Sequence, residues 1–285
     1  MSLYGFPVLY ALFVWWFSTG LIIYLDNLPQ RTFRWSMLGG TAVFAVSLYR
    51  LYATADDTSV TGAYGAFTYG VLAWGWQEMS FFMGYVTGPR KHACAHGCSG
   101  WRHFWHGVET SLYHELAIIA SAAAIVALTW GGANQVGTWT FVVLWAMRQS
   151  AKLNVFLGVR NLSVEFVPAH LAYLKSFLTC KPMNLLFPVS ISVSSVVLVL
   201  LLQRAGAAVT PYQAAGMTFL ATMLSLAIIE HWFLVLPLPF AELWTWVLKL
   251  RGASAPVTQE TVAEAQPCAH AETRVYKARA ATAHA

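Results

Sequence analysis

The fold is decided by one stretch of the sequence, HFWHGVETSLYHELAIIASAAAIVAL, which covers His103–Leu128. Its first half carries three histidines and two glutamates, whereas its second half is an apolar run typical of a membrane helix. Ionisable side chains inside hydrocarbon are costly, and by default they indicate function. The stretch therefore predicts a membrane helix that carries ionisable groups into the bilayer.

The composition of the whole chain agrees with this prediction. Of the 285 residues, 58% are hydrophobic and 10% are charged, whereas a soluble domain has about 25% charged residues. Seven apolar segments come near the length of about 20 residues that a membrane helix needs: Phe6–Leu25, Met37–Ala53, Ala66–Val86, Val108–Thr129, Gly137–Leu157, Phe187–Gln203 and Ala215–Leu236. We expect an all-α fold, namely a polytopic membrane helix bundle of about seven transmembrane helices.

The positions of Lys and Arg predict how this bundle is oriented. Basic residues follow the first, third and fifth segments and occur in the tail, while the opposite loops are nearly free of them, with Arg50 as the main exception. We therefore expect a periplasmic N-terminus and a cytoplasmic C-terminus. Residues 1–251 would form the transmembrane domain, and residues 252–285, which are poor in large apolar side chains, a flexible cytoplasmic tail. The net charge of +5 fits contact with anionic membrane lipid, so we expect no nucleic-acid partner.

Ionisable residues from four segments fall at a similar predicted depth near the cytoplasmic side. This polar layer consists of Glu78, Glu109, Glu115, Arg148, Lys152 and Glu230. A layer contributed by several helices is best explained by mutual pairing inside the bundle. Because Arg148 and Lys152 would neutralise carboxylates, an ion-pair network that fixes helix packing is the favoured interpretation.

Three other interpretations of these residues remain open. A di-metal carboxylate site needs about four carboxylates and two histidines, for which the candidates are Glu78, His106, Glu109, His114, Glu115, Glu230 and His231; however, the usual Glu-x-x-His spacing does not occur. Alternatively, His114 or His231 would offer an axial imidazole to a tetrapyrrole cofactor. A transporter would use Arg148 and Lys152 as anion or proton-coupling groups, but no inverted repeat supports it.

Two further segments on the predicted cytoplasmic side contain candidate residues. The loop after the third apolar segment alternates His92, Cys94, His96 and Cys98. These are zinc-ligand types, but four of them within seven residues cannot easily wrap one tetrahedral ion, so a basic loop without metal is the plainer interpretation.

The second of these segments, FLGVRNLSVEFVPAHLAYLKSF at Phe156–Phe177, repeats apolar residues at helical spacing. We expect an amphipathic helix at the cytoplasmic interface. Its polar side would cover the polar layer as an interfacial lid with the residues Arg160, Asn161, Glu165 and His170. The run LPLPFAELWTWVLKLR at Leu236–Arg251 predicts another interfacial helix.

Three stretches carry a resemblance to a known family: FLGVRNLSVEFVPAHLAYLKSF, YHELAI at Tyr113–Ile118, and EHWFLVLPLPFAELWTW at Glu230–Trp246. They resemble the PuhE-type photosynthetic complex assembly proteins of anoxygenic phototrophic bacteria, and the likeness extends from about the first segment to Arg251. The resemblance implies a protein of the bacterial inner (intracytoplasmic) membrane, encoded alongside the reaction-centre H subunit, which affects the accumulation of photosynthetic complexes or bacteriochlorophyll. It supplies no catalytic residues.

We therefore expect a factor for assembly of reaction-centre and light-harvesting complexes, or for handling of bacteriochlorophyll, rather than an enzyme. Its partners would be membrane lipid and reaction-centre or light-harvesting subunits, and its cofactor bacteriochlorophyll, a precursor of it, or a transition metal. The alternative is a membrane metal-dependent oxidoreductase that acts on a lipophilic substrate.

Overall fold

The computed structural model describes residues 2–95, 97–162 and 164–236. This part of the chain is built from helices, and the long ones are α1 (Ser2–Asp26), α2 (Gln30–Ala53), α3 (Val60–Phe82), α4 (Gly100–Leu128), α5 (Val136–Leu157), α6 (Leu186–Gly206) and α7 (Pro211–Phe233). Two short 3₁₀ helices, η1 (Val164–Phe166) and η2 (Ala169–Phe177), lie between α5 and α6. The all-α prediction is confirmed, and each of the seven predicted segments coincides with a long helix.

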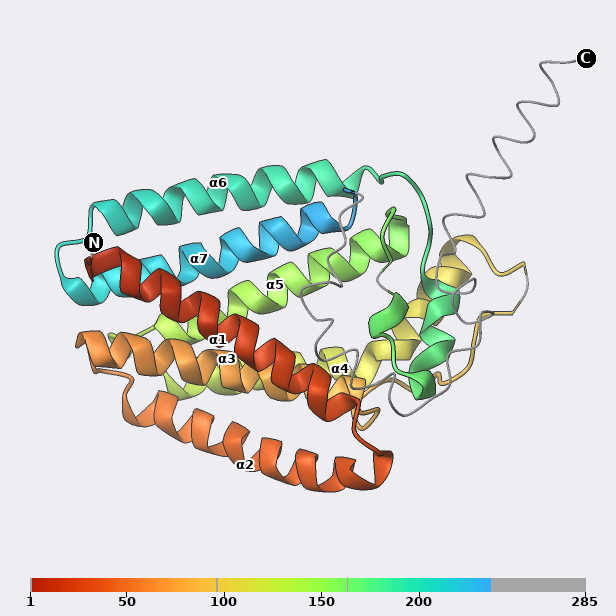
Figure 1. The fold of residues 1–285 in the computed structure, drawn as a ribbon, viewed down its shortest axis with the longest axis horizontal. Coiled ribbons are helices and arrows are strands. Elements are labelled where there is room, and N and C mark those ends of the chain that lie inside the picture. Colours follow the sequence, from red (N-terminus) through yellow and green to blue (C-terminus); the bar gives the residue numbers. More distant parts are fainter. Residues whose placement is uncertain (1, 96, 163, 237–285) are drawn as a thin grey trace, which may run out of the picture.

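Successive long helices run in opposite directions along the long axis of the molecule (Figure 1). The connections after α2, α4 and α6 lie at the same end as the N-terminus. The connections after α1, α3 and α5 lie at the opposite end, together with η1 and η2 (Figure 1). The bundle is therefore up-and-down, and all long loops with basic residues gather at one end, as the sequence predicts.

The centre of the bundle is α3, which packs against α1, α2, α5 and α7. Its contact with α5 is close because the side chains between the two backbones are small. A Cβ atom on Gly70 would lie 2.7 Å from the carbonyl oxygen of Gly137, and a Cβ atom on Gly137 would lie 2.6 Å from that of Ala66. Small residues four positions apart, such as Ala66 and Gly70, are typical of helix contacts in membranes.

Aromatic side chains fill the remaining space between α1, α3, α5 and α7. The rings of Phe67 and Phe219 stack with their centroids 4.4 Å apart, and Trp74 meets Phe141 edge-on at 5.5 Å. Phe67, Phe141 and Phe219 are fully buried. Such offset and edge-to-face pairs add stabilisation beyond the burial of their area, so this cluster fixes how the four helices meet.

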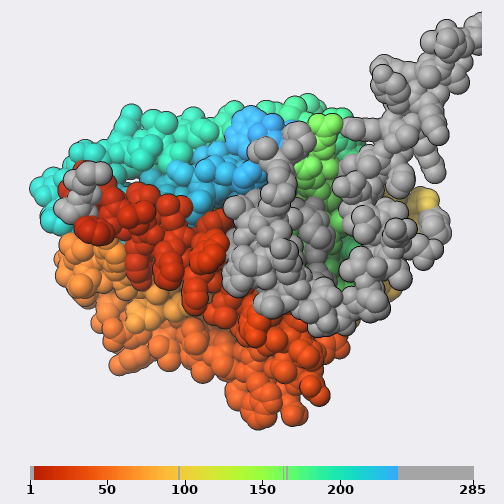
Figure 2. All heavy atoms as spheres, viewed as in Figure 1, coloured from red at the N-terminus to blue at the C-terminus, as the bar shows by residue number. Residues whose placement is uncertain are grey.

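The surface of the bundle is that of a membrane protein. The helices α1, α4, α6 and α7 are long and apolar enough to cross a membrane. Rows of large apolar side chains are exposed on α1, which lies across the face seen in Figure 2, and on α6: Phe6, Leu9, Phe13 and Phe17, and Val189, Val193, Val196 and Leu200. Contiguous apolar surface of this extent is rare on soluble monomers.

The remaining long helices, α2, α3 and α5, are not among the four that meet this criterion. Polar side chains lower the hydropathy of two of them: α2 carries three arginines, and α5 carries Arg148, Gln149 and Lys152. The count of seven spans and the orientation of the bundle therefore stay predictions.

The expected amphipathic helix between α5 and α6 is instead two short 3₁₀ helices. The break falls at Val167–Pro168, between η1 and η2. Proline has no amide N–H and disfavours helical geometry in the residue before it. The interfacial helix expected at 236–251 and the tail 252–285 lie almost wholly outside the described residues, as does His96, so the domain boundary at residue 251 stays a prediction.

Candidate functional site

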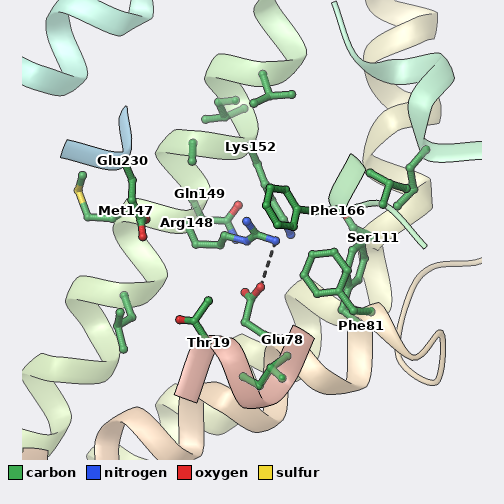
Figure 3. A pocket seen from close by; sticks show the side chains of 18 of the residues that line it. Thr19, Glu78, Phe81, Ser111, Met147, Arg148, Gln149, Lys152, Phe166 and Glu230 are labelled. Carbon is green, nitrogen blue, oxygen red and sulfur yellow. Dashed lines mark ion pairs between the residues drawn. The ribbon is translucent and has the colours of Figure 1, made fainter. Parts of the chain in front are cut away.

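A cavity of about 680 Å³ lies between α1, α3, α4, α5 and α7, next to η1 and η2. Aromatic side chains form much of its wall, namely Trp74, Phe81, Phe82, Phe104, Phe156, Phe166 and Phe177. Sites for small molecules have volumes of about 300 to 1,000 Å³ and are mostly apolar with a few placed polar groups. The cavity meets both conditions, because members of the polar layer project into it (Figure 3).

The first polar feature of the cavity is an ion pair between α3 and α5. The guanidinium of Arg148 lies 3.1 Å from the carboxylate of Glu78 (Figure 3). It also lies over the ring of Phe82, 5.7 Å from the ring centroid. Glu78 Oε1 and Arg148 Nε find no hydrogen-bond partner within the described part of the chain, so this pair has hydrogen-bonding capacity in reserve.

A second ion pair joins α4 to α5 one helical turn further along. Nζ of Lys152 lies 2.5 Å from the carboxylate of Glu115, and the side-chain amide of Gln149 donates to the other oxygen of that carboxylate. Arg148 and Lys152 are four residues apart and therefore share one face of α5. Thus α5 directs two cations toward the cavity, and each meets a carboxylate from a different helix.

The other acidic residues of the predicted polar layer occupy two different environments. Glu230 of α7 lines the cavity, and its carboxylate accepts a hydrogen bond of 3.2 Å from the indole N–H of Trp15 on α1. Glu109 lies outside the cavity, where it forms an ion pair of 3.4 Å with Arg90, and its side chain is 44% exposed. The polar layer is thus drawn from α3, α4, α5 and α7, but it divides between the cavity and the surface.

The two histidines predicted as axial ligands differ, because both ring nitrogens of His231 lie within hydrogen-bond distance of protein atoms, whereas Nδ1 of His114 finds no hydrogen-bond partner within the described residues. His231 Nδ1 lies 2.8 Å from the carbonyl oxygen of Ala227, and its Nε2 lies 2.9 Å from the hydroxyl of Ser150. His114 is 1% exposed, and its ring packs against Phe81 with 4.7 Å between centroids. His231 is among the residues that line the cavity and His114 is not. Ligation of a pigment by either imidazole would require rearrangement.

The seven residues predicted as a metal set do not come together. Helical phase separates His106 and Glu109, at the exposed start of α4, from Glu115 on the cavity side. Glu78 and Glu115 contact cations instead of each other. Within the described ranges, the ligand atoms close enough to share one ion belong to Cys94, Cys98 and His106, so His106 is the member of the predicted set that joins such a cluster.

The residues predicted as an interfacial lid anchor the segment after α5. His170 Nε2 lies 2.9 Å from the carbonyl oxygen of Phe82, at the end of α3. The side-chain amide of Asn161 donates to the carbonyl of Phe233 at 2.7 Å, at the end of α7. Arg160 is exposed, and the side chain of Glu165 lies outside the described part of the structure.

This segment turns an apolar side to the cavity, rather than the polar side that we expected. The residues that it contributes to the cavity wall are Leu162, Phe166, Val167, Pro168, Leu174 and Phe177. Sequence reasoning also missed Trp15 and Gln149, which bind the carboxylates of Glu230 and Glu115. Their signal was a hydrogen-bond donor inside an apolar helix, which needs a partner when it is buried.

Together, the fold and the cavity define a protein whose described part is a helix bundle, with helices long and apolar enough to cross a membrane and a cavity that carries paired charges. The chain belongs to the family described as "Protein of unknown function (DUF3623)", whose model matches residues 1–255. It is 40% identical, over 261 residues, to the "Uncharacterized 30.4 kDa protein in puhA 5'region" of Rhodobacter capsulatus. The aligned part covers 90% of this chain and 94% of that relative. No solved structure matches the chain.

Proposed function

We propose that this chain is a membrane protein that serves photosynthesis as a factor for the assembly of reaction-centre and light-harvesting complexes. In this proposal its cavity holds a lipophilic molecule with a polar group, and bacteriochlorophyll or a precursor is the candidate. The observation that carries the proposal is the similarity to the relative from Rhodobacter capsulatus. That relative is 40% identical over 94% of its own length, and it is named for its place 5' of puhA. The PuhE-type resemblance implies the same gene neighbourhood.

The form of the cavity supports a binding role. Its aromatic and aliphatic wall suits the body of a lipophilic molecule. Arg148 and Lys152 suit an anionic or hydrogen-bond-accepting group, because electrostatic interactions are strong where water is excluded. A polar group that enters would compete with Glu78 or Glu115 for these cations, so binding and helix pairing are coupled.

The same charges count against a metal-dependent oxidoreductase at this position. A cation placed between Glu78 and Glu115 would be repelled by Arg148 and Lys152, which already neutralise both carboxylates. The arrangement therefore favours binding over metal-dependent catalysis in this cavity.

The partners in this proposal are reaction-centre or light-harvesting subunits within the bacterial inner membrane. The exposed apolar rows of α1 and α6 are the surfaces available for lateral helix contacts. With the N-terminus in the periplasm, the loops that follow α1, α3 and α5 face the cytoplasm, where nascent subunits enter the membrane.

A gene-replacement experiment tests this role. The relative's gene is deleted in its host, and the absorption bands of the reaction centre and the light-harvesting complexes are measured in isolated membranes. We expect these bands to fall in the deletion strain and to return when this chain is supplied. The variant Thr19→Trp, which places an indole ring at the wall of the cavity beside the ion pair of Glu78 and Arg148, should fail to restore them. Val46→Trp, which changes an exposed position on α2 outside the apolar rows of α1 and α6, is the matched control and should succeed.

Immunoblotting of the membranes separates loss of function from loss of the protein. Normal bands in the deletion strain would refute the assembly role. Full restoration by Thr19→Trp would refute the role of the cavity while leaving the assembly role intact.

A further inference from the structure

A second cluster of reactive side chains lies outside the cavity, where the loop after α3 meets the first turns of α4. Nδ1 of His106 lies 3.5 Å from Sγ of Cys94 and 3.4 Å from Sγ of Cys98. These three ligand atoms all lie within 4.8 Å of one another. Nδ1 of His103 lies 3.4 Å from Sγ of Cys94. Cys94, Cys98 and His106 thus form a compact set of three ligand atoms, and His103 reaches this set through its contact with Cys94.

We propose that Cys94, Cys98, His103 and His106 bind a divalent transition-metal ion, and that this ion is Zn²⁺. Zinc binds thiolate sulfur at about 2.3 Å and imidazole nitrogen at about 2.0 to 2.1 Å in a tetrahedron. With these bond lengths, the edge from sulfur to nitrogen is about 3.6 Å. The three nitrogen-to-sulfur separations, 3.4 to 3.5 Å, are within about 0.2 Å of that edge.

The order of the ligands along the chain suits a compact site. The two cysteines are separated by three residues, within the usual range for zinc sites. The histidines are separated by two residues on α4, one fewer than is usual, but three positions apart on a helix still places them on one face. The loop turns around Cys98 at Gly97 and Gly100, whose φ angles of 80° and 62° are readily adopted by glycine.

Contacts around the cluster hold the ligands in place. The ring of His103 lies between Phe156 and Phe177, nearly parallel to both, with centroid distances of 5.4 and 5.3 Å. The amide of Cys94 donates to the hydroxyl of Ser176 at 3.0 Å. Such outer contacts orient metal ligands and raise the affinity of a site.

The start of the loop is anchored as well. Arg90 forms its ion pair with Glu109, and its amide also donates to the carbonyl of Glu109 at 3.3 Å. The adjacent Gly88 packs directly on the backbone of α4, since a Cβ atom there would lie 1.9 Å from the same carbonyl oxygen. The loop therefore reaches the cluster along a fixed path.

The donor set identifies the class of ion. Thiolate and imidazole ligands select zinc and similar ions over Mg²⁺ and Ca²⁺, which prefer oxygen. Two thiolates neutralise the divalent ion, and their two protons are released when it binds. Because four protein ligands complete a tetrahedron, the site would be structural. It would join the loop after α3 to the start of α4, whose Phe104 lines the cavity.

Metal analysis of the full-length protein in mild detergent tests this site. We expect one zinc ion per chain. After chelation, added Co²⁺ should produce the thiolate charge-transfer absorption and the d–d bands of tetrahedral cobalt. Cys98→Ser and His106→Ala should each weaken binding more than about tenfold, since even outer contacts contribute this much. His92→Ala changes an exposed histidine in the same loop and is the matched control, which should bind normally.

The variant His106→Cys keeps the test decisive if a ligand deletion fails to fold, because a three-cysteine, one-histidine site should retain zinc. Absence of both zinc and the cobalt spectrum in the wild-type protein would overturn the proposal. Undiminished binding in the folded Cys98→Ser and His106→Ala variants would overturn it too, and would leave the sulfur–nitrogen contacts as thiol–imidazole hydrogen bonds.

Discussion

Arg148 and Lys152 enter the cavity from one face of α5, and each meets a carboxylate from another helix. A buried ion pair gains little over apolar packing, but the removal of one partner leaves a charge without compensation. These pairs therefore constrain which helices lie together more than they add to total stability. They also keep two cations at a place where a ligand can meet them.

A double-mutant cycle on Glu78 and Arg148 tests whether these two residues stabilise the fold through their ion pair. We expect Arg148→Gln to lower the free energy of unfolding by about 1 to 3 kcal/mol, less than for a fully buried pair because both side chains are partly exposed to the cavity. The double variant with Glu78→Gln should lose less than the sum of the single losses, by about 1 kcal/mol. Denaturant titration in detergent measures all three.

The pair of Arg90 and Glu109 is the comparison for this cycle, because the Glu109 side chain is 44% exposed whereas that of Glu78 is 14% exposed, and solvent screens a more exposed carboxylate more strongly. Strictly additive losses for Glu78 and Arg148 would contradict the proposed coupling.

At the scale of single residues, the sequence indicates which ionisable residues lie within apolar segments, but it does not indicate which of them pair with one another. The ionisable residues of the polar layer stand out because charges inside apolar segments are rare. Which acid meets which base depends on the rotation of each helix against its neighbours, and Glu109 meets Arg90 in a loop for this reason. The sequence also did not show that two cysteines and two histidines come together, because Cys94 and Cys98 belong to a loop whereas His103 and His106 belong to a helix.

At the scale of elements, the close contact of α3 with α5 places Glu78 beside Arg148. Gly70 and Gly137 allow this contact, since a Cβ atom on either would lie within 2.7 Å of a backbone oxygen of the other helix. Backbone atoms cannot move aside as a flexible side chain does. The two glycines therefore help to position the ion pair in the cavity, in addition to allowing the helices of the core to pack closely.

Gly70→Val should force α3 and α5 apart. We expect a loss of about 1 to 3 kcal/mol in the free energy of unfolding, the usual cost of overpacking, together with weaker coupling between Glu78 and Arg148 in the cycle above. Gly39→Val is the matched control, because nothing lies within 4 Å of a Cβ atom at this glycine of α2. If both variants unfold at the same denaturant concentration, the close contact is not what holds the two helices.

The existence of the helices was predictable from hydropathy, but their ends were not. The helix α4 begins at Gly100 rather than at Val108, because hydropathy locates the apolar part and the helix continues through WRHFWHG. The segment at 162–173 has helical spacing of apolar residues, yet Pro168 breaks it into η1 and η2. The apolar residues of this segment line the cavity. Hydropathy alone cannot distinguish residues that line a cavity from residues that contact lipid.

At the scale of the whole molecule, the cavity, the two ion pairs and the apolar side chains of η1 and η2 form one site between the helices. The bundle surrounds it with helices whose outer faces are apolar. A lipophilic molecule would enter from the bilayer and meet its polar partners only inside. In the function that we propose, the protein holds such a molecule during the assembly of photosynthetic complexes.

The most direct test is to identify what the cavity holds. The protein is purified in mild detergent from a phototrophic host, and the molecules extracted from it are analysed by absorption spectroscopy and mass spectrometry. We predict bacteriochlorophyll or a precursor at about one molecule per chain, retained in Val46→Trp, the control on α2, and lost in Thr19→Trp. A preparation that contains only membrane phospholipid, in equal amounts in the wild-type protein and in Thr19→Trp, would contradict the account.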